Sequence, residues 1–117
     1  MTKIGVKLPP ITKDELREVY LYGKSMINIY ETHEMAATAF HDFVDSSVPL
    51  SVKRTYMVRQ SILFETGTYI VFQQYRRENL IGKRFDYISV NMPCTAEMQF
   101  FLSTRLNEGG LLRAGPY

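Results

Sequence analysis

Apolar positions in the first part of the chain recur with the period of an α-helix. Thr12 and Glu15 form a capping box there, in which a hydroxyl and a carboxylate satisfy free backbone donors at a helix start. Because no proline follows until Pro49, the pattern predicts one long helix over residues 13–46. At about 100° per residue its apolar positions share a sector of about 100°; they are Val19, Tyr22, Met26, Ile29, Tyr30, Ala37, Phe40 and Val44.

A seven-residue recurrence follows Pro49. It produces two apolar columns: Tyr56, Leu63 and Ile70 in one, and Met57, Phe64 and Val71 in the other. A half-buried strand would alternate at every second position, so the recurrence predicts a helix over residues 50–81. The alternative is an α+β fold, because the segment 66–72 has strong strand propensity and would allow a β-hairpin at residues 68–91.

The remaining segments predict a short third helix and two irregular ends. Thr95 is placed to cap a helix over residues 96–108, which the glycine pair after it would end. Residues 1–11 indicate an extended N-terminal arm that ends in two prolines, and residues 109–117 indicate a C-terminal tail. The predicted fold is therefore one mainly α domain of 117 residues, built on a long antiparallel helical hairpin.

The length of this hairpin has a consequence for its surroundings. Two helices of this size would each be about 45–50 Å long, whereas a compact domain of this length has a radius of gyration of about 13 Å. The third helix is too short to cover the hairpin. We therefore expect another chain to cover the apolar surface that is left.

Composition excludes few classes of protein. The net charge of +2 is too small to imply nucleic acid by itself. The single cysteine, Cys94, excludes an intrachain disulfide and a cysteine-based zinc cluster, which favours the cytoplasm or another reducing compartment. No apolar run approaches the length of a membrane span, so none is expected.

Both histidines lie close to carboxylates, which raises the question of a metal or acid–base site. His33 and His41 would be roughly 12 Å apart along a helix, too far to share one metal ion. We expect His33 to face the core and bond to a tyrosine, and His41 to pair with Asp45. The alternatives are an acid–base pair of His41 with Glu34, and a metal site; the metal site would draw on Glu34, His41, Asp45 and Glu65.

Cys94 precedes the third predicted helix, where a thiolate nucleophile would be favoured, but no histidine lies near it in sequence. We expect it to be a small buried residue. The chain has no Gly-rich phosphate loop, nucleophile elbow or dinucleotide fingerprint. No catalytic, cofactor-binding or metal-binding residue is therefore predicted.

Basic residues form two groups in the sequence. The first group is interleaved with Tyr75, Phe85 and Tyr87, and it comprises Arg76, Arg77, Lys83 and Arg84. The second group is Lys53, Arg54 and Arg59. Basic side chains contact phosphates and aromatic rings stack on bases, which makes nucleic acid a candidate ligand. Glu78 and Asp86 within the first group favour a solvated or protein-binding surface instead.

These observations favour a non-catalytic structural or interaction subunit that assembles through helical packing and docking of its arm and tail. Its partners would be proteins, in a homo-oligomer, a virion or a larger complex. The expected interface anchors are Tyr69, Phe72, Tyr75, Arg76, Phe85, Leu111, Leu112 and Tyr117. The alternative is a nucleic-acid-binding accessory or regulatory protein that uses the basic and aromatic residues of 75–87. A metal-dependent enzyme is the third hypothesis.

Overall fold

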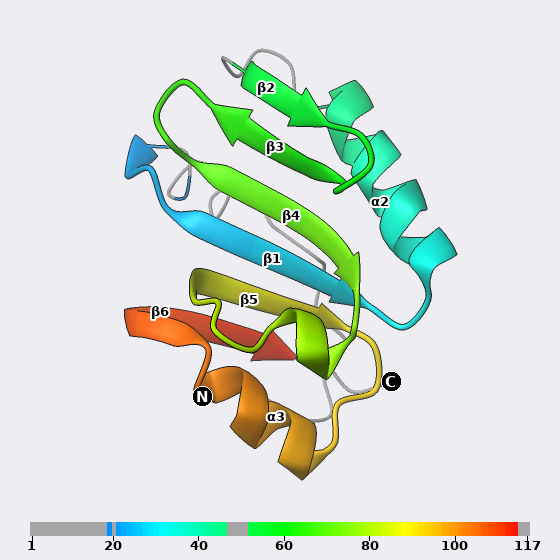
Figure 1. Ribbon diagram of the computed structural model, residues 1–117, viewed down its shortest axis with the longest axis vertical. Coiled ribbons are helices and arrows are strands. Elements are labelled where there is room, and N and C mark those ends of the chain that lie inside the picture. Colours follow the sequence, from blue (N-terminus) through cyan, green and yellow to red (C-terminus); the bar gives the residue numbers. More distant parts are fainter. Residues whose placement is uncertain (1–18, 20, 47–51, 115–117) are drawn as a thin grey trace.

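The structure is a computed structural model that describes residues 19, 21–46 and 52–114. A six-stranded sheet forms its centre, and helices pack on both faces (Figure 1). In chain order the elements are β1 (Ser25–Tyr30), α2 (His33–Ser46), β2 (Val52–Tyr56), β3 (Ser61–Phe64), β4 (Tyr69–Gln74), the 3₁₀ turn η1 (Arg77–Asn79), β5 (Phe85–Asn91), α3 (Ala96–Ser103) and β6 (Leu106–Ala114).

The sheet is mixed, with strand order β2-β3-β4-β1-β5-β6. β1 lies between β4 and β5 and is parallel to both, and β5 is parallel to β6. β2, β3 and β4 form an antiparallel meander at the other end of the sheet. The fold is therefore α+β, with a parallel half and an antiparallel half.

Each face of the sheet has its own apolar core. On one face, which we call the α2 face, Ala36 and Phe40 of α2 pack against β1, β3 and β4. On the opposite face, the α3 face, Leu80 after η1 and Met98 and Leu102 of α3 pack against β1 and β5. β1 alternates between the two cores, which explains why its residues 26–30 are all buried.

Local signals account for both helices. The Thr32 hydroxyl accepts a hydrogen bond from the Met35 backbone N–H at 3.1 Å, so it caps the first turn of α2. Thr95 caps α3 in the same way, because its side chain accepts from Met98 N–H at 3.1 Å. The prediction of Thr95 as a helix cap is confirmed.

The predicted helix over residues 13–46 is wrong for its middle part. Residues 25–30 form strand β1, and α2 begins only at His33. A strand that is buried on both faces shows an unbroken apolar run instead of alternation, and such a run also satisfies a helical projection. The capping box at Thr12 and the arm at residues 1–11 lie outside the described residues.

The predicted helix over residues 50–81 is also wrong, and so is the helical hairpin it would complete. Three strands and a 3₁₀ turn occupy the described part of this segment. Its seven-residue recurrence reflects the regular spacing of short strands in a meander, and Gly67, with φ of 89°, lies in the turn between β3 and β4. The alternative hairpin at 68–91 is absent too, because β1 separates β4 from β5.

The C-terminal part differs from the prediction in one further respect. α3 ends at Ser103, not near residue 108, and Leu106–Ala114 forms strand β6 alongside β5. Most of the predicted docking tail is therefore part of the sheet, and residues 115–117 lie outside the described range. The glycine pair that was expected to end a helix occurs within β6 instead.

The described chain is compact, with a radius of gyration of 13.3 Å. The inference that a partner must cover a long helical hairpin therefore loses its basis. No helix in the described ranges is long and apolar enough to cross a membrane.

Candidate functional site

A cleft of about 580 Å³ lies on the α3 face, between the antiparallel meander and the connection from β4 to β5. Its volume falls in the usual range for ligand pockets. The turn between β2 and β3 forms one wall, β4 forms the floor, and the segment around η1 forms the opposite wall. The lining residues are His33, Val58, Arg59, Gln60, Tyr69, Val71, Phe72, Gln73, Gln74, Arg76, Asn79, Lys83 and Phe85.

The topology explains why a cleft exists here. α2 packs on the opposite face of β3 and β4, while Leu80 and α3 pack over β1 and β5. The α3 face of the meander is therefore covered by none of the described helices. The connections after β1 and β4 leave toward opposite faces, and the carboxyl ends of such neighbouring parallel strands are a common place for ligand sites.

Gln60 fixes the turn that forms the first wall. Its φ of 53° is a left-handed backbone conformation that is uncommon outside glycine. Its side-chain amide donates to the Phe72 carbonyl at 3.1 Å, and its own carbonyl accepts from Phe72 N–H at 2.9 Å. These two bonds attach the turn to β4 and hold the adjacent Arg59 beside the cleft.

Three cations line the cleft from opposite sides. Arg59 comes from the first wall, whereas Arg76 and Lys83 come from the second. All three are exposed, and no carboxylate is among the described lining residues. The described lining of the cleft therefore carries three positively charged side chains and no negatively charged one.

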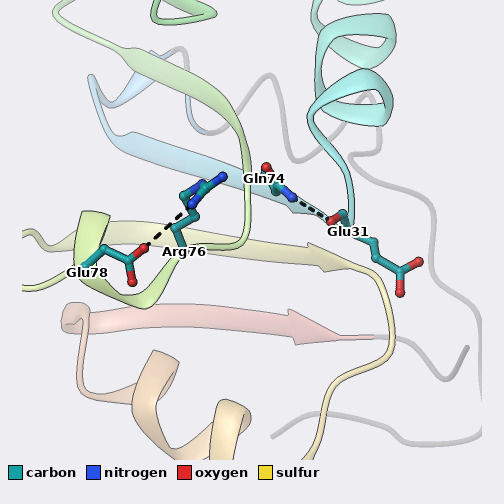
Figure 2. Close-up of polar contacts among 4 residues, drawn as sticks. All are labelled: Glu31, Gln74, Arg76 and Glu78. Atoms are coloured by element: carbon teal, nitrogen blue, oxygen red, sulfur yellow. Dashed lines mark hydrogen bonds and ion pairs between the residues drawn. The ribbon is translucent and has the colours of Figure 1, made fainter.

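Arg76 has a carboxylate nearby, Glu78, at 3.9 Å (Figure 2). More than half of each side chain is exposed, and ion pairs of this kind contribute little to stability. The Glu31 carboxylate points away from Arg76, while its backbone carbonyl accepts from the Gln74 amide at 3.2 Å. Arg76 thus stays available to an anion, and Gln74 is held at the end of β4.

The first basic group of the sequence is divided by the fold. Arg76 and Lys83 reach the cleft, but Arg77 does not line it. The guanidinium carbon of Arg77 lies 4.4 Å from the centre of the Phe101 ring, and its Nη1 lies 3.9 Å from Oε1 of Glu97 in α3. Arg84 donates to the carbonyls of Thr104 and Leu106, both at 3.4 Å, and so supports the start of β6.

Arg59 belongs to the second basic group, and the sheet brings it to the same cleft. Both groups are visible in the sequence, but the predicted helix would place them at its opposite ends. Their convergence depends on the pairing of β3 with β4 and on the return of the chain through η1, which no local pattern reveals.

The predicted interface anchors occupy very different environments. Phe72, Phe85 and Leu112 belong to the two cores and are too buried to serve as exposed anchors. Tyr69 and Tyr75 are half-buried; desolvation raises the pKa of the Tyr75 hydroxyl. The other predicted anchors are Arg76 and Leu111, which are exposed, and Tyr117, which lies outside the described residues.

Both histidines lie on α2, at its first position and in its middle. His33 is exposed at the start of α2, where it lines the cleft, so its predicted place in the core is wrong. His41 is also exposed, and the centre of its ring lies 5.5 Å from the centre of the Phe40 ring. No group of three or more metal-ligating side chains occurs in the part of the chain that the structure describes.

Cys94 lies half-buried just before α3. Burial raises the pKa of its thiol, which opposes formation of the thiolate that a nucleophile requires. Its environment therefore agrees with a packing role.

Comparison with known proteins gave no match: no family model fits the chain, and no curated protein or solved structure is significantly similar to it. The function is therefore inferred from the cleft itself.

Proposed function

We propose that this chain is a non-catalytic accessory protein that binds nucleic acid in the cleft. One observation carries the proposal: Arg59, Arg76 and Lys83 converge on a single concavity with no lining carboxylate among the described residues. The amides of Gln73 and Asn79 on the same lining add hydrogen-bonding groups for sugar or base.

Phosphate is an anion that this arrangement fits. Arginine offers a planar fork of donors that matches phosphate geometry, and lysine adds a point charge. Cations on two walls can contact successive phosphates of a polymer. A single small anion would need fewer cations than the three that are present. Binding would release condensed counterions, so the affinity would fall steeply as salt is raised.

The first prediction concerns the cleft cations. Arg59→Ala with Arg76→Ala should weaken binding of a labelled oligonucleotide by about tenfold or more. The same double variant should reduce the slope of log affinity against log salt by about 0.7 for each phosphate of a single strand that is no longer neutralised. Fluorescence anisotropy over a salt series measures both quantities.

A matched control removes the same charge elsewhere. Arg77→Ala with Arg105→Ala deletes two arginines that lie over Phe101 and outside the cleft. This control should keep the wild-type affinity and salt slope. Equal losses in both double variants would show that net charge, not the cleft, controls binding, and absence of binding by the wild type would overturn the proposed function.

The second candidate function is an assembly subunit, favoured by exposed apolar side chains beside α3. Ile81, Phe100 and Leu111 have exposed fractions of 64%, 73% and 40%. We call these three residues the α3 patch. Grooves of about 410 and 530 Å³ lie on the two sides of Phe100. Clustered exposed apolar groups mark interaction surfaces more often than isolated ones do.

The occupant that fits the α3 patch is a second copy of the chain. Charges of both signs surround it, with Arg77 and Arg105 beside Glu97. A surface that carries both signs of charge can face a copy of itself without net repulsion, and isologous dimers are the commonest oligomers.

The second prediction tests this assembly. Phe100→Glu should shift the chain from dimer to monomer in size-exclusion chromatography with light scattering, because it places a charge in the proposed contact. Met57→Glu, which changes an exposed residue of the β2–β3 turn, should leave the dimer intact. A wild type that stays monomeric throughout the concentration series would exclude the dimer.

A further inference from the structure

The cleft continues onto a strip of sheet surface that carries aromatic rings. Tyr69 of β4 lies opposite Leu63 of β3, which lies opposite Arg54 of β2. In the neighbouring row, Tyr56 of β2 lies opposite Ser61 of β3. Residues that lie opposite one another share a face, so all of them belong to the α3 face of the meander.

Both tyrosines retain exposed surface. Tyr56 and Tyr69 are half-buried, in contrast to the aromatic residues of the α2 face in β3 and β4, which are Phe64 at 0% and Phe72 at 2% exposure. The meander therefore has a phenylalanine face turned toward α2 and a tyrosine face turned toward the cleft. The rings of the tyrosine face are therefore partly accessible to a ligand.

Arginines accompany these rings. The guanidinium carbons of Arg54 and Arg59 lie 6.0 and 5.3 Å from the centre of the Tyr56 ring. Both distances are within the range of cation–π contacts. Arg59 also lines the cleft, so it connects the Tyr56 ring to the three converging cations. The Tyr56 ring therefore lies beside two arginines, one of which also lines the cleft together with Tyr69.

Tyr69 is held in place within this surface. Its hydroxyl donates to the Ser61 Oγ at 3.1 Å, and its side chain lines the cleft. A ring that is fixed before binding loses little conformational freedom when a planar ligand stacks on it.

We propose, on the basis of the proposed function, that the ligand is single-stranded nucleic acid laid across β2, β3 and β4. Its bases stack on Tyr69 and on the Tyr56–arginine group. Its phosphates contact Arg59, Arg76 and Lys83.

The shape of the site distinguishes a single strand from a duplex. The major groove of a duplex admits a protruding helix or β-ribbon, but here the cations lie within a concavity. Stacking on protein rings also requires bases that are free from their own base pairs. Aromatic rings combined with a basic groove are the usual means of binding single strands without strong sequence preference.

The experiment compares a labelled oligothymidylate of about 12 nucleotides with a duplex of equal length, at several salt concentrations. The wild type should bind the single strand at least about tenfold more tightly. Tyr56→Ala and Tyr69→Ala should each lower this affinity by about tenfold and leave the salt slope unchanged, because they remove stacking and no charge.

Conservative variants separate stacking from folding. Tyr69→Phe deletes the hydrogen bond to Ser61 but keeps the ring, so it should retain wild-type affinity. Tyr22→Ala removes a tyrosine that is 73% exposed and is not among the cleft-lining residues, and it should have no effect. If Tyr69→Phe weakened binding as much as Tyr69→Ala, the stacking role of this ring would be excluded.

The outcomes distinguish this inference from the proposed function. Equal affinity for duplex and single strand, with binding still dependent on Arg59 and Arg76, would overturn the inference alone. Binding of neither form would overturn both. Preferential single-strand binding that does not change in either tyrosine-to-alanine variant would exclude the stacking surface and leave only the basic cleft.

Discussion

Asp86 joins three parallel strands at their amino-terminal ends. One carboxylate oxygen accepts from the Ser25 backbone N–H at 2.9 Å and from the Ser25 hydroxyl at 3.3 Å. The other accepts from the Asn107 amide at 3.0 Å, while Asp86 N–H donates to the Ser25 hydroxyl at 3.1 Å. A single side chain thereby connects β1, β5 and the start of β6, which explains why a carboxylate is half-buried here.

The third prediction follows from the charge state of Asp86. Burial acts to raise its pKa, but hydrogen bonds from Ser25 and Asn107 and the charge of Lys24 outweigh it, so the pKa is lowered. A carboxyl whose pKa is lower in the folded state stabilises the fold at neutral pH, and this contribution is lost as the pH falls through the lowered value. Asp86→Asn should therefore reduce the free energy of unfolding by about 1–3 kcal/mol at pH 7.

Urea denaturation at neutral and acidic pH checks this prediction. The difference between wild type and Asp86→Asn should become smaller as the pH falls below the usual carboxyl pKa of about 4. Asp45→Asn, at an exposed position of α2, serves as the control and should change stability by no more than about 0.5 kcal/mol. A difference that stayed constant with pH would show that the charge of Asp86 is unimportant.

At the scale of elements, two loops meet at the amino-terminal end of β1. Gly23, just before β1, has φ of 62°, and a Cβ added there would lie 2.8 Å from the backbone carbonyl oxygen of Thr66 in the β3–β4 turn. Thr68 within the same turn donates from its hydroxyl to the Val19 carbonyl at 3.0 Å. The segment that leads into β1 and the meander are thus fitted closely together.

The fourth prediction concerns this junction. Gly23→Ala should lower the free energy of unfolding by about 1–3 kcal/mol, because it combines a left-handed backbone with a clash against a backbone atom. Gly67→Ala tests the backbone effect alone, since φ is 89° there but no atom lies within 4 Å of the added Cβ. Thermal unfolding of both variants should show the larger loss for Gly23→Ala. A larger loss of stability for Gly67→Ala would mean that the chain accommodates the clash of the added Cβ with Thr66 without a loss of stability.

At the scale of the whole molecule, local features could be predicted from the sequence, but the order and pairing of the strands could not. The Thr95 cap was predicted correctly because it depends on neighbouring residues only. The sheet was not predicted, because β1 is buried on both faces and pairs with strands far away in the sequence. The candidate site has the same property: both basic groups are visible in the sequence, but only strand pairing brings Arg59 to Arg76 and Lys83.

The central position of β1 also has a consequence for the order in which the chain is made. β1 is the first described strand to be synthesised, but its two neighbours, β4 and β5, begin only at Tyr69 and Phe85. A nascent chain must therefore keep an apolar strand unpaired until much of the remainder has been translated. Fragments that stop before β4 contain neither neighbour of β1, so early termination leaves this apolar strand with both edges unpaired, a condition that favours aggregation.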